Sequence, residues 1–267
     1  MYRFLLTRRW VGFLVLCIVV ALACVRLGFW QLSRYQMRSA DNARVDRNAA
    51  APAVPAAALL RVGASVPGPD QWRRVQAVGR YEPSATMLVR QRPLNGSNGF
   101  EVLTPLVTTS GVVLVVDRGW VPSGASALST PTVPDPPAGL VAVTGLVRAS
   151  ETGQLRSQDL PSGQVRHINV AQIAEGIGRA AYGDYVQLVA QQPVDTQQPA
   201  GAQKPVLLPL DDSQPAMLNL AYTVQWWVFA VIALVGYVVF ARREAAERAQ
   251  ARVPLNGHRQ VEQAPAG

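Results

Sequence analysis

Few residues of this chain could do chemistry. The 267-residue sequence has two histidines, His167 and His258, and two cysteines, Cys17 and Cys24. It contains no HExxH or CxxC motif, no serine nucleophile elbow and no phosphate-binding loop. Because acid–base and nucleophilic catalysis near neutral pH depends largely on such side chains, the sequence predicts that the protein is not an enzyme and has no metal centre.

The remaining candidates for ligand binding each have a structural alternative. Cys17 and Cys24 lie seven residues apart in an apolar run, where small helix-packing residues are expected, with a metal or haem role as the alternative. His167 is expected to be structural or exposed to solvent, and a role as a ligand is the alternative. The glycine-rich stretch 95–99 joins two expected strands, which favours a turn over a phosphate cradle.

Two apolar segments, Trp10–Leu32 and Leu218–Phe240, are each longer than the roughly 20 residues needed to span a bilayer. Arginines flank the outer side of both, at Arg8 and Arg9 before the first segment and at Arg242 and Arg243 after the second. Since such charges stay in the cytoplasm, both termini are expected there. A cleaved signal peptide, a lipoprotein site at Cys24 and a twin-arginine signal are weaker alternatives for the first segment.

The expected chain is therefore a multi-pass membrane protein with one extracytoplasmic domain. Its predicted parts are a cytoplasmic N-terminus (1–9), a transmembrane helix (10–32), the outer domain (33–217), a second transmembrane helix (218–240) and a disordered cytoplasmic tail (241–267). An Ala/Pro linker is expected at 49–58. Lys204 is the sole lysine, and this dominance of arginine suggests a GC-rich bacterial genome, so the membrane is expected to be the cell membrane.

The outer domain is predicted to be mainly β, in an α+β arrangement. Short β-branched runs separated by Gly, Pro and Asn are typical of strands and turns. The expected strands are Arg73–Tyr81, Thr86–Gln91, Phe100–Thr108, Val112–Asp117, Leu140–Val147 and Tyr185–Ala190. Val112–Val116 is apolar at every position, which indicates a strand covered on both faces. Helical spacing predicts one helix at Val170–Ala181, and loops are expected at 122–137 and 191–205.

The charge distribution excludes one class of partner. The net charge of +8 divides into +4 for residues 1–32, +2 for the middle and +2 for the tail. No basic stripe with interleaved aromatics appears in the middle region, so no nucleic-acid partner is expected. The basic flanks instead point to membrane lipid.

A polar and aromatic face is predicted near the outer end of the second span. Asn219, Tyr222, Trp226 and Phe229 fall on one side of a helix, with Gln225 beside them. Trp30 and Arg34 lie four residues apart on the first helix at the same depth. One interpretation is an aromatic belt with ordinary helix–helix hydrogen bonds, and Trp30 with Arg34 as an interfacial anchor. The other is that this face meets the first helix, or a partner's helices, around a bound porphyrin.

Arg26 is the one charged residue inside the first apolar segment. A charge near the bilayer centre costs at least about 2.5 kcal/mol. Arg26 is close enough to the outer end to extend its guanidinium to the headgroups. Alternatively, it could pair with a carboxylate such as a haem propionate.

Specific strings in the sequence resemble the surfeit-locus protein 1 family of cytochrome c oxidase assembly proteins. These strings are Leu27–Arg34 (LGFWQLSR), Gly79–Tyr81 (GRY), Val89–Pro93 (VRQRP), Gly99–Leu106 (GFEVLTPL), Val116–Pro122 (VDRGWVP) and Leu220–Trp227 (LAYTVQWW). The resemblance extends from Arg8 to Arg243. It implies a respiratory-chain assembly chaperone that helps to insert haem a into the catalytic subunit of the oxidase. The implied partners are that subunit and, as a second candidate, the haem a synthase, with haem a as a transient cofactor.

This chain departs from the resembled family at one position. Several members carry a histidine, proposed as a haem a ligand, where this sequence has Asn219. Protein haem iron is usually held by His, Met, Cys or Tyr, which leaves Met217, Tyr222 and Cys24 as the nearest candidates. The alternative function is therefore a structural or stabilising membrane subunit of a respiratory complex that binds no cofactor.

The string Asp117-Arg118-Gly119-Trp120 also has two interpretations. In the first, the turn ends a buried strand, with Gly119 easing the bend and Arg118 stacking on an aromatic ring. In the second, Arg118, Gly119 and Trp120 form the rim of the outer domain that faces the membrane or the oxidase.

Overall fold

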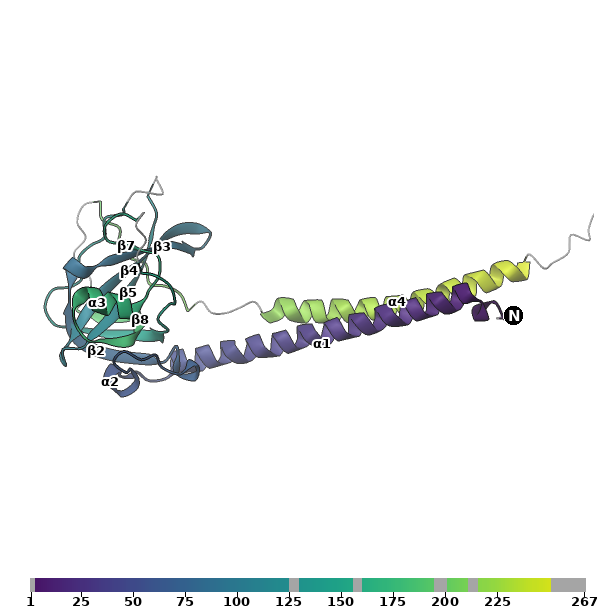
Figure 1. Cartoon of the computed structure of the whole chain (residues 1–267), viewed down its shortest axis with the longest axis horizontal. Coiled ribbons are helices and arrows are strands. Elements are labelled where there is room, and N and C mark those ends of the chain that lie inside the picture. The colour runs from purple at the N-terminus through teal and green to yellow at the C-terminus, as the bar shows by residue number, and fades with distance from the viewer. Residues whose placement is uncertain (1–2, 125–129, 156–159, 195–200, 211–215, 251–267) are drawn as a thin grey trace, which may run out of the picture. The chain divides into compact units, whose positions relative to one another are not determined.

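The computed structural model describes residues 3–124, 130–155, 160–194, 201–210 and 216–250. Two long terminal helices flank a β-rich domain in the chain (Figure 1), which confirms the predicted architecture. The chain divides into a helical unit, residues 1–40 with 214–267, and a domain, residues 41–213. The predicted tail from residue 251 onwards lies outside the described residues, whereas 241–250 are helical.

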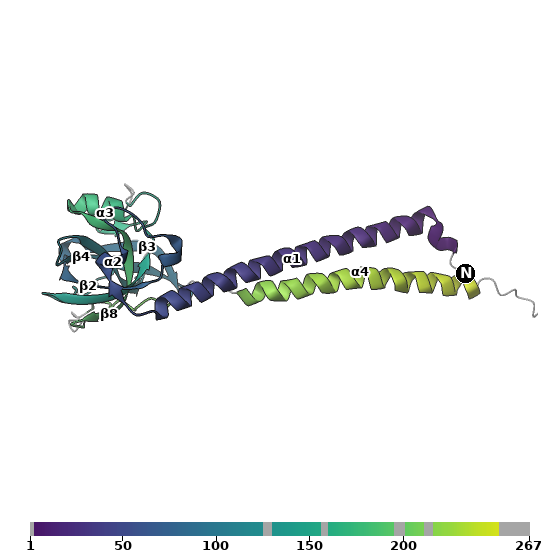
Figure 2. The same ribbon diagram turned by 90° about the horizontal axis from the view of Figure 1, so that it is seen from below.

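The helical unit consists of a short 3₁₀ turn, η1 (Arg3–Leu6), most of helix α1 (Arg8–Ala50) and helix α4 (Ala216–Gln250). Both helices contain a window apolar enough to cross a membrane, with mean hydropathy 2.6 in α1 and 2.1 in α4. Helices α1 and α4 run side by side in two perpendicular views (Figures 1 and 2). Only 22% and 11% of these windows are covered by protein, as expected for helices that face lipid rather than a soluble core.

The domain contains all six predicted strands and two short additional ones. The strands are β1 (Val54–Pro55), β2 (Arg74–Tyr81), β3 (Met87–Leu94), β4 (Ser97–Thr108), β5 (Val113–Pro122), β6 (Val141–Arg148), β7 (Gln164–Val165) and β8 (Ala181–Gln192). The helical pieces are α2 (Ala56–Leu59), α3 (Val170–Ile177), η2 (Gly68–Asp70) and η3 (Pro83–Ala85). The mainly β, α+β composition is therefore confirmed.

Five of the strands close into a barrel. The sheet order is β1-β2-β6-β8-β5-β4-β3-β7, and an additional pairing between β2 and β4 joins its two sides. At this junction Gly79 pairs with Thr108, and a Cβ on Gly79 would lie 2.3 Å from the carbonyl oxygen of Val107. Only glycine allows the two backbones to approach this closely, so Gly79 is required where the barrel closes.

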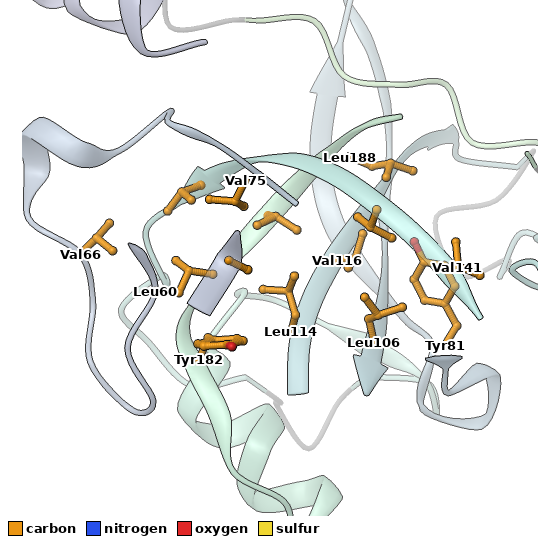
Figure 3. Packing of buried hydrophobic residues seen from close by; sticks show 14 residues of the cluster. Leu60, Val66, Val75, Tyr81, Leu106, Leu114, Val116, Val141, Tyr182 and Leu188 are labelled. Carbon is orange, nitrogen blue, oxygen red and sulfur yellow. The ribbon is translucent and has the colours of Figure 1, made fainter. Parts of the chain in front are cut away.

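Strand β5 separates two apolar cores, as its continuous hydrophobic run predicts. Leu114 and Val116 point into the barrel interior among residues that Figure 3 shows. Val113 and Val115 lie in a second cluster that includes Ile173 of α3. All four β5 side chains are fully buried, and burial of a valine or leucine contributes about 1.5–3 kcal/mol. Helix α3 therefore covers the outer face of the barrel at β5.

Helix α3 begins as predicted but ends earlier. Asn169 caps its N-terminus, where its side chain accepts a hydrogen bond from the Gln172 amide at 3.1 Å. Gly178 has φ +71° and terminates the helix in the left-handed conformation, which is the usual role of glycine at this position. The predicted end at Ala181 is wrong, because that residue already begins β8.

The segment predicted as a linker, 49–58, differs from that expectation. Helix α1 ends at Ala50, just before Pro52, where proline removes a backbone donor. The following residues then form β1, which pairs in parallel with β2, and α2. Ala56 is buried in the barrel core, so the Ala/Pro composition reflects close packing against the sheet.

The last turns of α1 belong to the domain. Val45 and Ala49 pack with Trp72 and Leu146. The side-chain amide of Asn48 donates to the carbonyl oxygens of Pro69 and Gln71, both at 2.7 Å. These contacts fix the end of the helix to the turn that precedes β2.

Candidate functional site in the helical hairpin

Small residues of α1 and α4 pack with tryptophan side chains of α4 where the two helices meet. Ala21 and Cys24 of α1 form a buried cluster with Ala230 of α4, and Trp226 packs against them. A Cβ on Gly28 would lie 2.2 Å from Nε1 of Trp227, so the indole occupies the space that a side chain at Gly28 would need. Helices in membranes associate through such small-residue contacts. Both Cys17 and Cys24 are buried free thiols, in keeping with the packing role predicted for them.

Asn219 is buried on the same face of α4 as Ala230, and one end of its amide is unsatisfied. The residue is 9% exposed, and its Nδ2 has no hydrogen-bond partner among the described residues. Thr223, one turn further, is 1% exposed and donates to the backbone oxygen of Asn219 at 2.9 Å. A buried donor without an acceptor costs about 1–3 kcal/mol, so this position favours binding of an acceptor.

The predicted polar and aromatic face is divided between two environments. Asn219 and Trp226 turn towards α1, whereas Tyr222 and Gln225 are exposed. The helix–helix face of α4 is instead formed by Asn219, Thr223, Trp226 and Ala230. Thr223 and Gly28 were missed by sequence reasoning; the spacing of Ala21, Cys24 and Gly28 on α1 was the signal that could have indicated them.

The predicted residues of α1 lie on its exposed surface. The guanidinium of Arg34 lies 5.5 Å from the centre of the Trp30 ring, which is a cation–π distance. Both residues are exposed, and so is Arg26, for which the described part of the chain provides no ion-pair partner. These three side chains are therefore available to lipid, ligand or a partner.

The hairpin also carries an apolar groove of about 440 Å³. Its lining residues are Ile18, Ala21, Leu22, Val25, Trp227, Ala230, Val231 and Leu234. None of these is a usual axial ligand of haem iron. Among the other candidates, Cys24 is covered by protein, while Met217 and Tyr222 are exposed. The described helical unit contains no histidine, and none of these three candidates lines the groove.

The Asp117–Trp120 string does not end a strand. It lies within β5 at a bulge opposite Glu101 and Leu103, where Gly119 adopts φ +124°. A Cβ on Gly119 would lie 2.4 Å from the backbone oxygen of Val206. The predicted turn is therefore wrong. The reason is that Gly119 produces a bulge, in which the strand continues, rather than a reversal of the chain.

Arg118 and Trp120 pack inside the domain. Arg118 is 2% exposed, donates to the Pro134 oxygen at 3.2 Å and places its guanidinium 5.9 Å from the Tyr81 ring centre. The Trp120 indole donates to the Arg92 oxygen at 2.7 Å. The stacking predicted for Arg118 is thus present, and little of these side chains is left to form a rim.

A cluster of half-buried charges, with the buried Asp117, accompanies this bulge. Arg92 lies 3.1 Å from Glu101 and 2.6 Å from Glu151. Burial raises the pKa of Glu101, with Arg92 opposing the rise. Burial, reinforced by Glu101, also raises the pKa of Asp117 well above its usual value, although the Gly119 amide donates to that carboxyl. These groups serve the packing of the barrel.

Among the described residues, His167 belongs to no cluster of metal-ligating side chains. His167 Nδ1 lies 3.6 Å from Glu151, and the His167 side chain is 44% exposed. Within the described ranges, no group of three or more His, Cys, Asp or Glu residues could hold a metal ion. His258 lies outside the described residues.

A comparison with protein families decides the relationship. The model of the SURF1 family matches residues 18–231, which include most of the hairpin and the whole barrel. The chain belongs to the SURF1 family. A SURF1-like protein of Mycobacterium tuberculosis is 31% identical over 257 residues, or 94% of this chain and 91% of that protein. A SURF1-like protein of Rickettsia felis is 22% identical over 223 residues, covering 82% of this chain and 92% of the relative.

Membership of the SURF1 family supports a general role in the assembly of cytochrome c oxidase. The SURF1 family consists of assembly factors rather than known enzymes, and the two apolar helices support association with a membrane.

Proposed function

We propose that this SURF1-family protein assists the insertion of haem a into the catalytic subunit of cytochrome c oxidase, or stabilises that subunit until insertion is complete. Family membership supports the oxidase as the client. The single structural observation that carries the proposal is the unsatisfied amide of Asn219 in an interface between two apolar helices.

The amide of Asn219 needs an acceptor that α1 and α4 do not provide. Hydrogen bonds of Asn or Gln side chains hold transmembrane helices together, so an acceptor on a helix of the catalytic subunit would relieve the cost of the unpaired group. Tyr222 and Gln225 lie on the exposed side of the same two turns. They supply further polar contacts at this level of the hairpin.

This chain acts on the protein partner rather than on the haem iron. Position 219 of the hairpin is an asparagine and not a histidine. The exposed side chains of Trp30, Arg34 and Arg26 can contact a porphyrin edge or its carboxylates without ligating the metal. Haem a would then pass transiently between the haem a synthase, as the supplier, and the catalytic subunit, as the acceptor. The iron ligands remain those of the client throughout.

The proposed topology places both termini in the cytoplasm and the barrel outside the cell membrane. The arginines at the Arg8 and Arg243 ends of the two helices support this orientation. Reporter fusions at an exposed loop residue such as Ser110 and at the C-terminus test it. An active periplasmic reporter at Ser110 is expected, and activity of a cytoplasmic reporter there would contradict the topology.

Site-specific photo-crosslinking tests the proposed contact. A photoreactive residue at Tyr222 or Gln225 is expected to capture the catalytic subunit in cells that are still assembling the oxidase. The same residue at Val231 or Val235, exposed roughly two to four turns deeper in α4, is the matched control and should capture it less.

Two results would count against the proposal. Equal capture at all four positions would show that the region of Tyr222 and Gln225 is not the specific contact with the catalytic subunit. Stoichiometric co-purification with the mature, haem-loaded oxidase would favour a permanent structural subunit. The optical spectrum of the purified protein is expected to show little or no haem a, because the described hairpin has no histidine and its apolar groove contains no usual axial ligand.

A further inference from the structure

The end of the hairpin at Arg8 and Phe240 has aromatic contacts that basic residues acting only as a topology signal would not need. Aromatic rings of both helices interlock there. Trp10 contacts Tyr237 at 5.9 Å between ring centres, and Phe13 contacts Tyr237 at 5.6 Å and Phe240 at 6.2 Å. Aromatic clusters of this kind lie at the level of the lipid headgroups.

The 3₁₀ turn η1 folds onto this aromatic cluster. Phe4 is buried, and its ring meets Trp10 edge-on at 5.2 Å. The backbone oxygen of Phe4 accepts hydrogen bonds from both the amide and the hydroxyl of Thr7. On the other side the guanidinium of Arg248 lies 4.7 Å from the centre of the Phe4 ring. The chain before α1 is thereby held against α4.

The segments at this end of the hairpin, which come from both ends of the chain, carry several cations. Five exposed arginines lie in the segments that form this end: Arg3, Arg8, Arg9, Arg242 and Arg243. Arg248 is already paired with Glu244 at 2.7 Å, and Glu247 is the other acid of this region. None of the five arginines has a hydrogen-bond or ion-pair partner within the part of the chain that the structure describes.

We propose that this end of the hairpin is a binding site for the headgroup of an anionic phospholipid. Guanidinium groups bind phosphate bidentately, and each basic residue near an anionic membrane surface adds to the attraction. The free amide N–H groups in the first turn of α1 lie beside Arg8 and Arg9 and also favour an anion.

An exposed leucine supports a lipid as the source of the phosphate. Leu6 lies between Arg3 and Arg8 in the sequence and is 83% exposed, although its side chain is apolar. A free phosphate or an acidic peptide leaves this side chain in water. A phospholipid instead covers it with the upper part of an acyl chain while its phosphate meets the arginines, which is the arrangement of an interfacial anchor.

Lipid titration of the purified full-length protein in detergent micelles tests the proposal, because micelles impose no topology on the chain. Native mass spectrometry measures binding of phosphatidylglycerol and of phosphatidylcholine with identical acyl chains. We expect a clear preference for phosphatidylglycerol. Arg242→Gln with Arg243→Gln should weaken that binding about thirtyfold. Arg8→Gln with Arg9→Gln should weaken it similarly, since both chain ends contribute.

The control removes the same charge elsewhere. Arg80→Gln with Arg179→Gln neutralises two exposed domain arginines and should leave lipid binding within about twofold. Phe4→Ala keeps every charge but releases η1, and it should weaken phosphatidylglycerol binding as well. Equal binding of both lipids, an equal loss in the control, an unaffected Phe4→Ala variant, or displacement of the lipid by excess inorganic phosphate would each overturn the proposal.

Discussion

Replacement of Gly28 by alanine tests the close approach of the two apolar helices. The added Cβ would lie 2.2 Å from Nε1 and 2.5 Å from Cδ1 of Trp227. Ordinary contact begins at 3.4 Å, so the indole must retreat by about 1.2 Å at its nearest atom, the difference between these two distances. Trp227 is also held edge-on against Phe29 at 5.7 Å, which limits the directions in which it can move.

The expected cost of Gly28→Ala is about 1–3 kcal/mol, the usual range for overpacking at a tight contact. Alanine also favours a helix by up to about 1 kcal/mol over glycine, which offsets part of this cost. Unfolding of the full chain by SDS from mixed micelles, followed by tryptophan fluorescence, measures the net change. The midpoint is expected to fall to a lower SDS fraction.

Two glycines of the same helices provide controls. A Cβ at Gly12 or Gly236 would have no neighbour within 4 Å, so Gly12→Ala and Gly236→Ala should be neutral or slightly stabilising. If Gly28→Ala behaves like these two variants, the packing of Gly28 against Trp227 does not hold the hairpin together and the reasoning fails.

Three further predictions concern the domain of the full-length protein and are measured by its thermal unfolding. Because burial raises the pKa of Asp117, its contribution to stability is complete below the unfolded pKa of about 4 and falls as the pH rises towards the folded-state pKa. Asp117→Asn should therefore flatten the decline in stability above pH 4, and an unchanged slope would contradict this. Gly119→Ala should cost over about 2 kcal/mol from its positive φ and the backbone clash, whereas Gly96→Ala, with positive φ but open space, should cost about 1 kcal/mol; equal losses would exclude the clash. Asn48→Ala removes two hydrogen bonds to the 67–71 turn and should cost about 1–3 kcal/mol; a loss below about 0.5 kcal/mol would show that these bonds do not fix the helix end.

Local signals were sufficient to predict the strands of the barrel. The alternation of β-branched runs with Gly, Pro and Asn located all six long strands, and the unbroken run of β5 predicted a strand buried on both faces. The closure of the barrel was not predicted, because it depends on the β2–β4 pairing at Gly79. A single glycine shows its role only when the backbone that approaches it is known.

The candidate site was predicted in part. Helical spacing predicted that Asn219 and Trp226 share one face of α4, but it did not predict that Tyr222 lies outside the buried face. The polar side chains suggested that the face with Tyr222 makes the contact, whereas the two helices meet where side chains are small or absent. The Arg118–Gly119 pair resembled a turn for a similar reason, since a bulge and a turn need the same residue types.

The haem a content of cytochrome c oxidase in a strain that lacks this protein tests the central claim most directly. Oxidase with reduced haem a per catalytic subunit is expected in the deletion strain. Wild-type protein and Gly12→Ala are expected to restore that content, and Asn219→Leu is not. A full haem a complement in the deletion strain would contradict the account.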